Sequence, residues 1–276
     1  TFKRTWGGRK HGFTNYYLLA MGAAIWSTPL QKMHEYPALT FIRFFNNHGL
    51  LETNVPVQWY TVRGGSEQYV SLIRKHLIKH NVTFSPGASH VKRTDTTVTV
   101  IDANEKAQDF DKVVFACHSD EALMLLDSSS NDEKALLSTI QFQTNTVVLH
   151  TDADFMPKHK KAWSSWVYLS EHTFDDSKTI SLTYWMNNLQ PLNSAKDYFV
   201  TVNPGKSPVS EKIINSHVFS HPLFNQKAIE AQDKIQSIQG QNNTYFCGAY
   251  LRHGFHEDGI WSAVKVAEKL GVNIAW

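Results

Sequence analysis

The chain has 276 residues, and its 27 Lys and Arg against 25 Asp and Glu leave a net charge of +2. Hydrophobic residues make up 42% and charged residues 19%, which is typical of a globular protein and excludes disordered, collagen-like and coiled-coil chains. The length allows one large domain or two of ordinary size. The balanced charge argues against nucleic acid as a partner, because such binding needs a basic surface.

Two cysteines, Cys117 and Cys247, each lie in an apolar run that predicts a buried strand. We therefore expect free thiols rather than a disulfide framework, and a cytoplasmic location. The longest apolar candidate, residues 18–26, is about half the length that a membrane helix requires. No transmembrane segment is predicted.

The first half of the chain alternates helical and strand-like patterns. Apolar residues at helical spacing predict helices over 15–27 and 37–47. Residues 58–62 predict a strand, after which Gly64 and Gly65 turn the chain and Ser66 caps a helix. Short strands are expected at 82–84, 89–92, 96–101 and 112–116, the last buried on both faces because it is almost entirely apolar.

Longer strands follow, with the alternation of an antiparallel sheet. They are expected at 140–150, 163–169, 179–186 and 198–202. A helix over 224–238, a buried strand over 244–248 and a helix over 259–270 that stops at Gly271 complete the chain. Because no linker or repeat divides the sequence, we expect the two sheets to share one continuous body.

Residues 244–271 form the most informative stretch. A buried strand ends at Gly248, and after a loop containing Gly254 a helix begins at Gly259. The free amides and positive dipole end of that helix would face whatever the strand end faces, which suits an anion or a polar ring. The alternative is an ordinary strand–loop–helix unit without a ligand.

This stretch resembles the C-terminal FAD-contacting segment of the flavin-containing amine oxidase superfamily. The chain is similar, more specifically, to the amine-oxidase-like flavoproteins related to the N-terminal half of plant cyclopropane fatty-acid synthases. Motifs of that kind run in family order from near residue 16 to the C-terminus. They are AIWS at 24–27, QWYTVR at 58–63, FMP at 155–157, AWSSW at 162–166, LTYWMN at 182–187, FVTVNP at 199–204 and GFHEDG at 254–259.

The resemblance implies a mixed α/β and α+β fold. It consists of an FAD-binding, GR2-type Rossmann-like domain that lacks its first βαβ unit, interleaved with an amine-oxidase-type substrate domain of antiparallel sheet and helices. The substrate domain would comprise residues 1–57, its helical part, and 128–240, its sheet. The FAD-binding domain would comprise residues 58–127 and 241–276.

One part of the family pattern is missing from this sequence. The family begins with a strand, a G-x-G-x-x-G turn that holds the pyrophosphate and an acidic ribose ligand. The pairs Gly7-Gly8 and Gly64-Gly65 have the wrong spacing for that turn. We therefore expect this chain to be an N-terminally truncated fragment, inactive by itself, with Thr1 set by an incomplete gene model.

By position, the resemblance implies eight FAD-contacting residues, most of which act through the backbone. They are Val91 for adenine, Ala116 beside the dinucleotide, Gly248, Ala249 and Tyr250 near the ribityl chain and pyrophosphate, and Asp258, Gly259 and Ile260 at the helix N-terminus facing the flavin. Amine oxidases usually carry a carboxylate just after the glycine matching Gly248. This chain has Ala249 and Tyr250 there, as its closer plant-like relatives do.

Four aromatic residues are candidates for the walls of an apolar substrate cavity, with plain core packing as the alternative. They are Trp163, Trp166, Tyr184 and Trp185. Lys158, Lys160 and Lys161 lie close to where some amine oxidases place a flavin-facing lysine, but no catalytic base is assigned.

A metal site is the less favoured interpretation of the last loop. His253, His256, Glu257 and Asp258 are all possible ligands, but neither an HExxH motif nor a Cys/His framework is present. We expect no metal, and a helix-capping role for Asp258.

The leading hypothesis is an FAD-dependent oxidoreductase that acts on a small-molecule or lipid substrate of hydrophobic character. The alternative is a catalytically silent flavin-fold module that partners a lipid-modifying methyltransferase. A third hypothesis is an interaction protein without flavin. Flavin binding separates the first two from the third, and flavin reduction by a substrate separates the first from the second.

Overall fold

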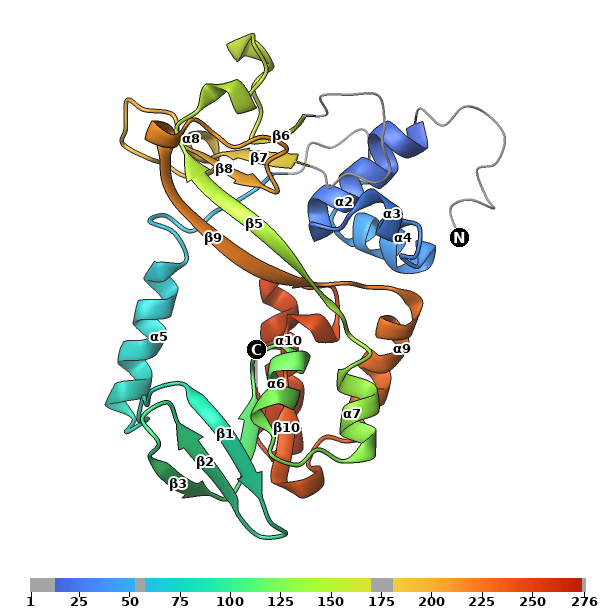
Figure 1. Cartoon of the computed structure of the whole chain (residues 1–276), viewed down its shortest axis with the longest axis vertical. Helices are drawn as coiled ribbons and strands as arrows, with labels where there is room; N and C mark the ends of the chain where they lie inside the picture. Colours follow the sequence, from blue (N-terminus) through green and yellow to red (C-terminus); the bar gives the residue numbers. More distant parts are fainter. Residues whose placement is uncertain (1–12, 53–57, 170–180, 275–276) are drawn as a thin grey trace. The chain divides into compact units, whose positions relative to one another are not determined.

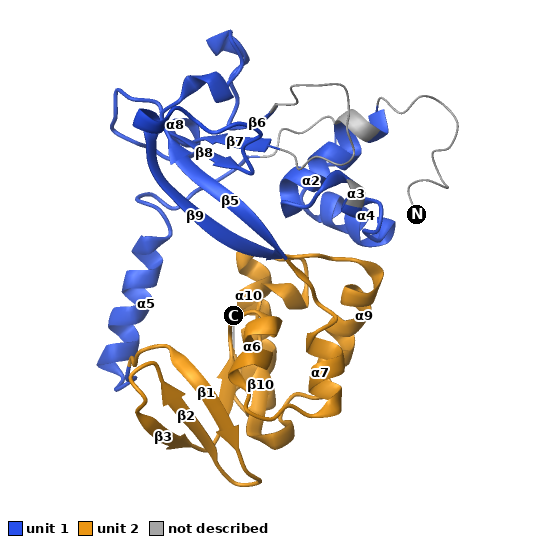
Figure 2. Ribbon diagram, in the orientation of Figure 1, with its two compact units in different colours: residues 1–83, 143–221 blue, residues 84–142, 222–276 orange. Residues whose placement is uncertain are grey.

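The computed structural model describes residues 13–52, 58–169 and 181–274 (Figure 1). Two compact units divide the chain, and each combines two separate stretches of sequence (Figure 2). Unit 1 comprises Thr1–Thr83 and Gln143–His221, and unit 2 comprises Phe84–Phe142 and Pro222–Trp276. Every helix within the described ranges is too short or too polar to cross a membrane.

Unit 1 begins with helices packed around aromatic side chains. They are the π-helix Thr14–Leu19 and the α-helices α2 (Ala20–Trp26), α3 (Leu30–Met33) and α4 (Ala38–Asn47). The centroid of the Trp26 ring lies 4.5 Å from the ring centroid of Tyr36 and 4.9 Å from that of Phe44. The helices predicted over 15–27 and 37–47 are therefore confirmed, and their apolar faces form a core.

The helix α5 (Glu67–Lys79) is also confirmed, although the Ser66 side chain makes no capping hydrogen bond. The strand predicted over 58–62 is wrong. Trp59 is 60% and Tyr60 89% exposed, and the segment pairs with no strand of the described residues. The same holds for the predicted strand 82–84. β-Propensity alone cannot hold an extended segment that lacks a neighbour to share its hydrogen bonds.

The sheet of unit 1 has five strands in the order β6-β7-β8-β5-β9. They are β5 (Phe142–His150), β6 (Trp166–Leu169), β7 (Ser181–Trp185), β8 (Phe199–Val202) and β9 (Ile213–Pro222). The pairs β6–β7, β7–β8 and β8–β5 are antiparallel, as predicted. The predicted residues 179–180 lie outside the described part. Strand β9 was not predicted, because most of its residues are exposed and no alternation marks it.

Short helical turns join these strands. They are the 3₁₀ helices η2 (Ala153–Phe155), η3 (Lys160–Ala162) and η4 (Ser210–Lys212), and the single turn α8 (Met186–Leu189). Asp152 caps η2 by accepting a hydrogen bond from the Asp154 amide.

Unit 2 holds two small sheets. Strands β1 (Ala88–Arg93), β2 (Val98–Asp102) and β3 (Ala107–Phe110) form an antiparallel sheet. Strands β4 (Val113–Phe115) and β10 (Thr244–Phe246) pair in parallel, although they are far apart in sequence. The expected two-sided burial of β4 is wrong, because the Val114 side chain is 41% exposed. Strand β3 was not predicted, since all four of its residues are exposed.

Four α-helices and two 3₁₀ helices complete unit 2. They are α6 (Ser119–Leu125), α7 (Asn131–Leu137), α9 (Gln226–Ile235) and α10 (His256–Lys269), with η5 (Gln241–Asn243) and η6 (Ala249–Leu251). The main core gathers apolar residues from both stretches of the unit, among them Val91, Phe115, Leu137, Ile235 and Phe246. Helix α9 confirms the prediction over 224–238, whereas α10 begins three residues earlier than predicted.

Candidate functional site

The carboxyl ends of β4 and β10 meet at one edge of their parallel sheet. The Cys247 amide donates to the Phe115 carbonyl at 2.9 Å, so the ladder continues one residue beyond β10. Gly248 follows immediately, and a Cβ there would lie 3.6 Å from the Cys117 carbonyl. Ligands of open α/β sheets bind outside the carboxyl ends of parallel strands. This edge is therefore the candidate cofactor site.

Helix α10 begins beside this edge, and the side chain of Asp258, a residue of its first turn, caps it. Asp258 is buried, and its Oδ2 accepts a hydrogen bond from the Phe255 amide at 3.0 Å. Its Oδ1 lies 3.7 Å from Arg252 Nε. The predicted capping role of Asp258 is thus confirmed, and its carboxylate is occupied by the protein itself. Glu257 adds a second negative charge at the positive end of the helix dipole.

Ser262 joins the strand end to the helix, and sequence reasoning missed it. Its Oγ accepts from the Gly248 amide at 2.9 Å and donates to the Gly259 carbonyl at 2.8 Å. The residue is 1% exposed. A lone serine in a helix carries no pattern that a sequence could reveal. The only signal was its position in the second turn of α10.

Gly248 is a glycine because Tyr250 fills the space where a side chain would go. A Cβ at Gly248 would lie 2.5 Å from Tyr250 Cε1 and 2.7 Å from its Cδ1. Tyr250 is 2% exposed and cannot swing away without emptying part of the core. Burial raises the pKa of the Tyr250 phenol well above its ordinary value, and the nearby Cys247 and Cys117 thiols add to this. The hydroxyl is therefore protonated at all physiological pH values.

The remaining residues expected at the cofactor fall into two places. Four of them lie around the strand ends and the start of α10, namely Ala116, Ala249, Gly259 and Ile260. Of these, Ala116 and Ile260 are exposed, and a Cβ at Gly259 would meet nothing within 4 Å. Val91 instead lies in the core on β1, 2% exposed, and its carbonyl already accepts from the Asp127 amide at 3.1 Å. The structure thus gathers seven of the eight predicted residues.

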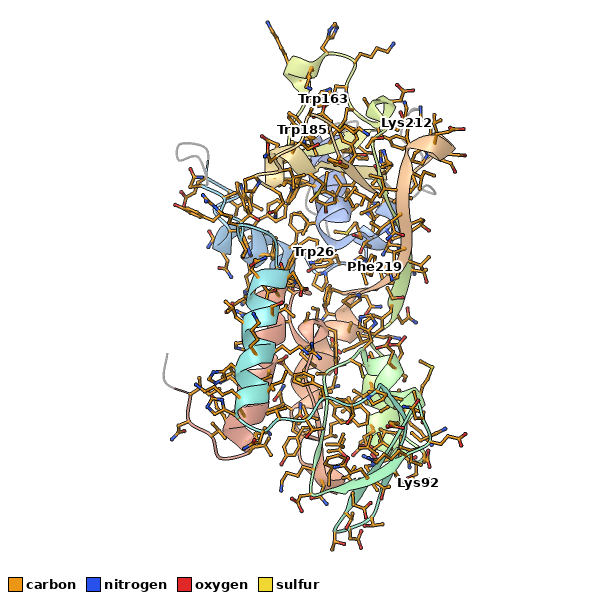
Figure 3. The ribbon with its side chains drawn as sticks, turned by 90° about the vertical axis from the view of Figure 1, so that its left-hand side faces the viewer. Trp26, Lys92, Trp163, Trp185, Lys212 and Phe219 are labelled. Atoms are coloured by element: carbon orange, nitrogen blue, oxygen red, sulfur yellow. The ribbon has the colours of Figure 1, made fainter. Side chains whose placement is uncertain are left out.

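The four aromatic candidates lie in unit 1, where the sheet divides them between its two faces. Trp166 and Tyr184 are directly opposite one another on β6 and β7, with ring centroids 5.9 Å apart. Trp163 and Trp185 pack edge to face at 5.1 Å in a different cluster, together with Phe199 (Figure 3). Successive residues of a strand point to opposite faces, so the neighbours Tyr184 and Trp185 cannot line the same wall.

The Trp163–Trp185 pair is held by its own polar contacts. Trp185 Nε1 donates to Asp197 Oδ1 at 3.0 Å, and Trp163 Nε1 donates to the Pro157 carbonyl at 2.7 Å. Lys160 Nζ lies 2.9 Å from Asp197 Oδ2 and 4.9 Å from the centroid of the Trp163 ring. Lys160 is thus engaged in an ion pair and a cation–π contact. Burial raises the pKa of Tyr184 on the other face.

No protein-family model and no curated protein matches the sequence. Several solved structures are similar to this chain in fold. Cyclohexylamine oxidase from Brevibacterium oxydans IH-35A is similar with a TM-score of 0.59 at 10% identity, over 98% of this chain and 67% of that one. Putrescine oxidase bound to putrescine is similar with a TM-score of 0.51 at 10% identity, over 76% of this chain and 54% of that one. A double mutant of putrescine oxidase gives the same TM-score at 11% identity.

These similarities establish the fold. The chain has a mixed α/β architecture with several sheets and shares the fold of the flavin amine oxidases, although it spans only about half of the putrescine oxidase. The edge formed by β4, β10 and α10 has Gly248 at the strand end, open space at Gly259 and a helix start, whose dipole favours an anionic group. Within the described residues, no three His, Cys, Asp or Glu side chains are grouped so that they could hold a metal ion.

Proposed function

We propose that this chain belongs to an FAD-dependent oxidoreductase that acts on a hydrophobic small molecule or lipid. The observation that carries the proposal is the flavin amine oxidase fold, shared over 98% of the chain with cyclohexylamine oxidase. Bound FAD would supply the electron transfer, so the protein residues need only position the cofactor and substrate and exclude water.

Backbone groups would hold the cofactor at the end of β10. Gly248 lets the Tyr250 ring pack against the strand end, and the first turn of α10 presents its dipole and an open surface at Gly259. Asp258 and Ser262 contribute by fixing that turn. The Val91 carbonyl already accepts from the Asp127 amide and the residue is buried, so the proposal includes no adenine contact by Val91.

The substrate would be enclosed in part by the Trp166–Tyr184 face of the sheet. Trp166 is 39% exposed and also lies near Trp59, with ring centroids 6.2 Å apart. Exposed aromatic surface of this kind favours an apolar ligand. Trp163 and Trp185 support the sheet from its other face, where they pack against Phe199.

An FAD titration of the purified chain tests the proposal, read by quenching of flavin fluorescence and by hydrogen exchange. We expect saturable binding that protects the amides of Ala249 and of the first turn of α10. The variant Gly259→Val, at a glycine with open space in the first turn of α10, should weaken it, while Gly87→Val, at an equally open glycine on another segment, should not. A folded wild-type chain that shows no protection at millimolar FAD would contradict the proposal.

Reduction of the bound flavin decides between the two flavin hypotheses. Bleaching of the visible spectrum by a hydrophobic amine or a lipid, without oxygen, supports an oxidoreductase. Binding without reduction by any candidate would instead favour the silent module with a lipid methyltransferase as its partner.

A further inference from the structure

Helix α5 has 13 residues, and none of them is buried. Its apolar side chains are exposed as well, with Leu72 at 66%, Ile73 at 54% and Ile78 at 52%. Most helices in proteins are stabilised by the packing of an apolar face, and isolated helices of about this length are marginal in water. Contacts within the helix itself therefore matter more for α5 than for a helix that covers a core.

Two histidines lie four residues apart at the C-terminal end of α5. His76 is in the last turn of the helix, His80 is its C-cap residue, and both are exposed to solvent. Their ring centroids are 4.2 Å apart, with an angle of 31° between the ring planes. Side chains at positions i and i+4 of a helix are neighbours on its surface, so the backbone of α5 keeps this pair together.

One hydrogen bond decides which nitrogen of His80 is available to a ligand. Its Nδ1 lies 2.8 Å from the His76 carbonyl, and because a carbonyl only accepts, Nδ1 must carry the proton. In the neutral ring, Nε2 then keeps its lone pair. Histidines that bind metal ions usually donate their other ring N–H in the same way, to a carboxylate or a backbone carbonyl. His80 is thus already in the tautomer of a metal ligand.

The charges near the pair decide whether a cation can stay there. The last carbonyls of α5 form the negative end of the helix dipole, which attracts a cation. Lys75 and Lys79 each precede a histidine by one residue, so they lie about 100° around the helix from the pair. Both lysines are exposed, and solvent and salt screen their repulsion. Neutral imidazole is a preferred ligand of Zn²⁺ and a poor one of Mg²⁺.

We propose that His76 and His80 bind one divalent transition-metal ion, of which Zn²⁺ is the probe, and that the ion cross-links the last turn of α5. Within the described residues no third His, Cys, Asp or Glu side chain is grouped with them, so water completes the coordination. The ion stabilises the turn because it binds the two imidazoles where the helix has brought them together. The pair lies in unit 1, whereas the candidate cofactor site lies in unit 2, so this inference does not depend on flavin.

Isothermal titration of the metal-free chain with Zn²⁺ tests the site. His76→Gln and His80→Gln should each bind about tenfold more weakly or less, since each removes one of the two ligands. Glutamine favours the helix at least as well as histidine, so both variants should stay folded. His159→Gln is the matched control, at an exposed histidine just before η3, and should bind as wild type does. Mg²⁺ should not bind the pair.

Hydrogen exchange of the backbone amides shows whether the ion stabilises the helix. We expect Zn²⁺ to slow exchange at residues 77–80 of wild type by about fivefold or more, and to have no such effect in His76→Gln or His80→Gln. Both cysteines are present in every variant, so any binding by the thiols contributes equally to all of them.

The other outcomes overturn the inference. Unchanged Zn²⁺ affinity of both variants would place the ion elsewhere on the chain. A loss of affinity without protection of residues 77–80 would remove the cross-linking of the helix. A folded wild-type chain that binds no Zn²⁺, or that binds Mg²⁺ equally well, would exclude an imidazole site. None of these results bears on the proposed function.

Discussion

Single residues of unit 2 decide how close the end of β10 comes to the start of α10. Gly248 has no side chain because the Tyr250 ring occupies its Cβ position, and Ser262 holds the Gly248 amide. The sequence predicts Gly248 through the family motif and the strand that precedes it. Ser262 and the burial of the Tyr250 ring could not be predicted, because both depend on contacts between segments that only the folded chain brings together.

A methyl group at position 248 tests this close approach. Gly248→Ala would place its Cβ 2.5 Å from Tyr250 Cε1, so the buried ring must shift and disturb the core. We expect a loss of about 1–3 kcal/mol in the free energy of unfolding, measured in urea. Gly87→Ala is the control, since nothing lies within 4 Å of its Cβ. Equal stability of the two variants would show that the ring moves at no cost.

Several elements are fixed by one buried ion pair. Arg93 on β1 lies 2.6 Å from Glu133 on α7, with side chains 5% and 1% exposed, and Arg93 also donates to Thr244 on β10. Burial alone would raise the pKa of the Glu133 carboxyl, but hydrogen bonds from Arg93 and from the Ser130 amide hold it below its ordinary value. The pair therefore connects a strand, a helix and the strand that carries the candidate site.

Removal of the Arg93 guanidinium should lower the free energy of unfolding at neutral pH. Arg93→Met leaves a buried, unpaired carboxylate, and we expect a loss of about 3–5 kcal/mol in urea unfolding. The exposed Lys92→Met is the control, whose ion pair at 3.9 Å is worth about 1 kcal/mol at most. Because the Glu133 pKa is lowered in the fold, the stabilisation is present above about pH 4.3 and is lost as the pH falls through the folded pKa. A loss that is the same at pH 7 and pH 3 would contradict this account.

The sheet of unit 1 contains a buried histidine that also makes stability depend on pH. His150 is fully buried, its Nε2 lies 2.7 Å from Thr201 Oγ1, and its Nδ1 accepts from the Asp152 amide. Burial lowers the pKa of His150 and the Lys212 charge lowers it further, against the opposing effect of Asp152. The ring is thus mainly neutral in the folded state at pH 7.

A histidine that is harder to protonate when folded stabilises the protein only at higher pH. The stabilisation is complete above about pH 6.5, the unfolded value, and is lost as the pH falls from there toward the lower folded pKa. We expect wild type to exceed His150→Asn in free energy of unfolding at pH 8, and the difference to shrink toward pH 5. The exposed His80→Asn serves as the control. A difference that stays constant with pH would show that His150 does not titrate differently in the two states.

Elements with strong periodicity were predicted, and those stabilised by tertiary contacts were not. Helices α4, α5, α9 and α10 have clear helical spacing, and each was found within three residues of its expected start. Helices α6 and α7 are seven residues long and depend on their capping boxes and on the core beneath them. Isolated helices this short are marginal, so local sequence gives them little signal.

At the scale of the whole chain, the two units differ in the residues that can report their unfolding, tryptophans by fluorescence and cysteines by thiol labelling. Five of the described tryptophans lie in unit 1 and one in unit 2, whereas both cysteines lie in unit 2. The tryptophans are Trp26, Trp59, Trp163, Trp166 and Trp185 in unit 1 and Trp261 in unit 2. Burial raises the pKa of both thiols, so thiol labelling is slow until unit 2 opens.

Truncating one core side chain in each unit should therefore separate the unfolding signal of tryptophan fluorescence from that of thiol labelling. Phe199→Ala, in the core of unit 1, should lower the urea midpoint of tryptophan fluorescence, and Phe246→Ala, in the core of unit 2, should speed thiol labelling by about tenfold or more. Each variant should affect the other signal less. Parallel changes in both signals for both variants would show that the chain unfolds as one cooperative body.

The pairing of β4 with β10 also determines when unit 2 can form during synthesis. Val113 pairs with Thr244, so the intervening chain, including most of the unit 1 sheet, must be made before this ladder can close. Until then the ribosome carries a nascent chain with Phe115 of β4 and the adjoining core uncovered, for several seconds at ordinary elongation rates. Contacts this distant in sequence also slow folding. Unit 2 therefore completes its core only late in synthesis, and a stop codon anywhere before Phe246 leaves β4 without its full partner strand.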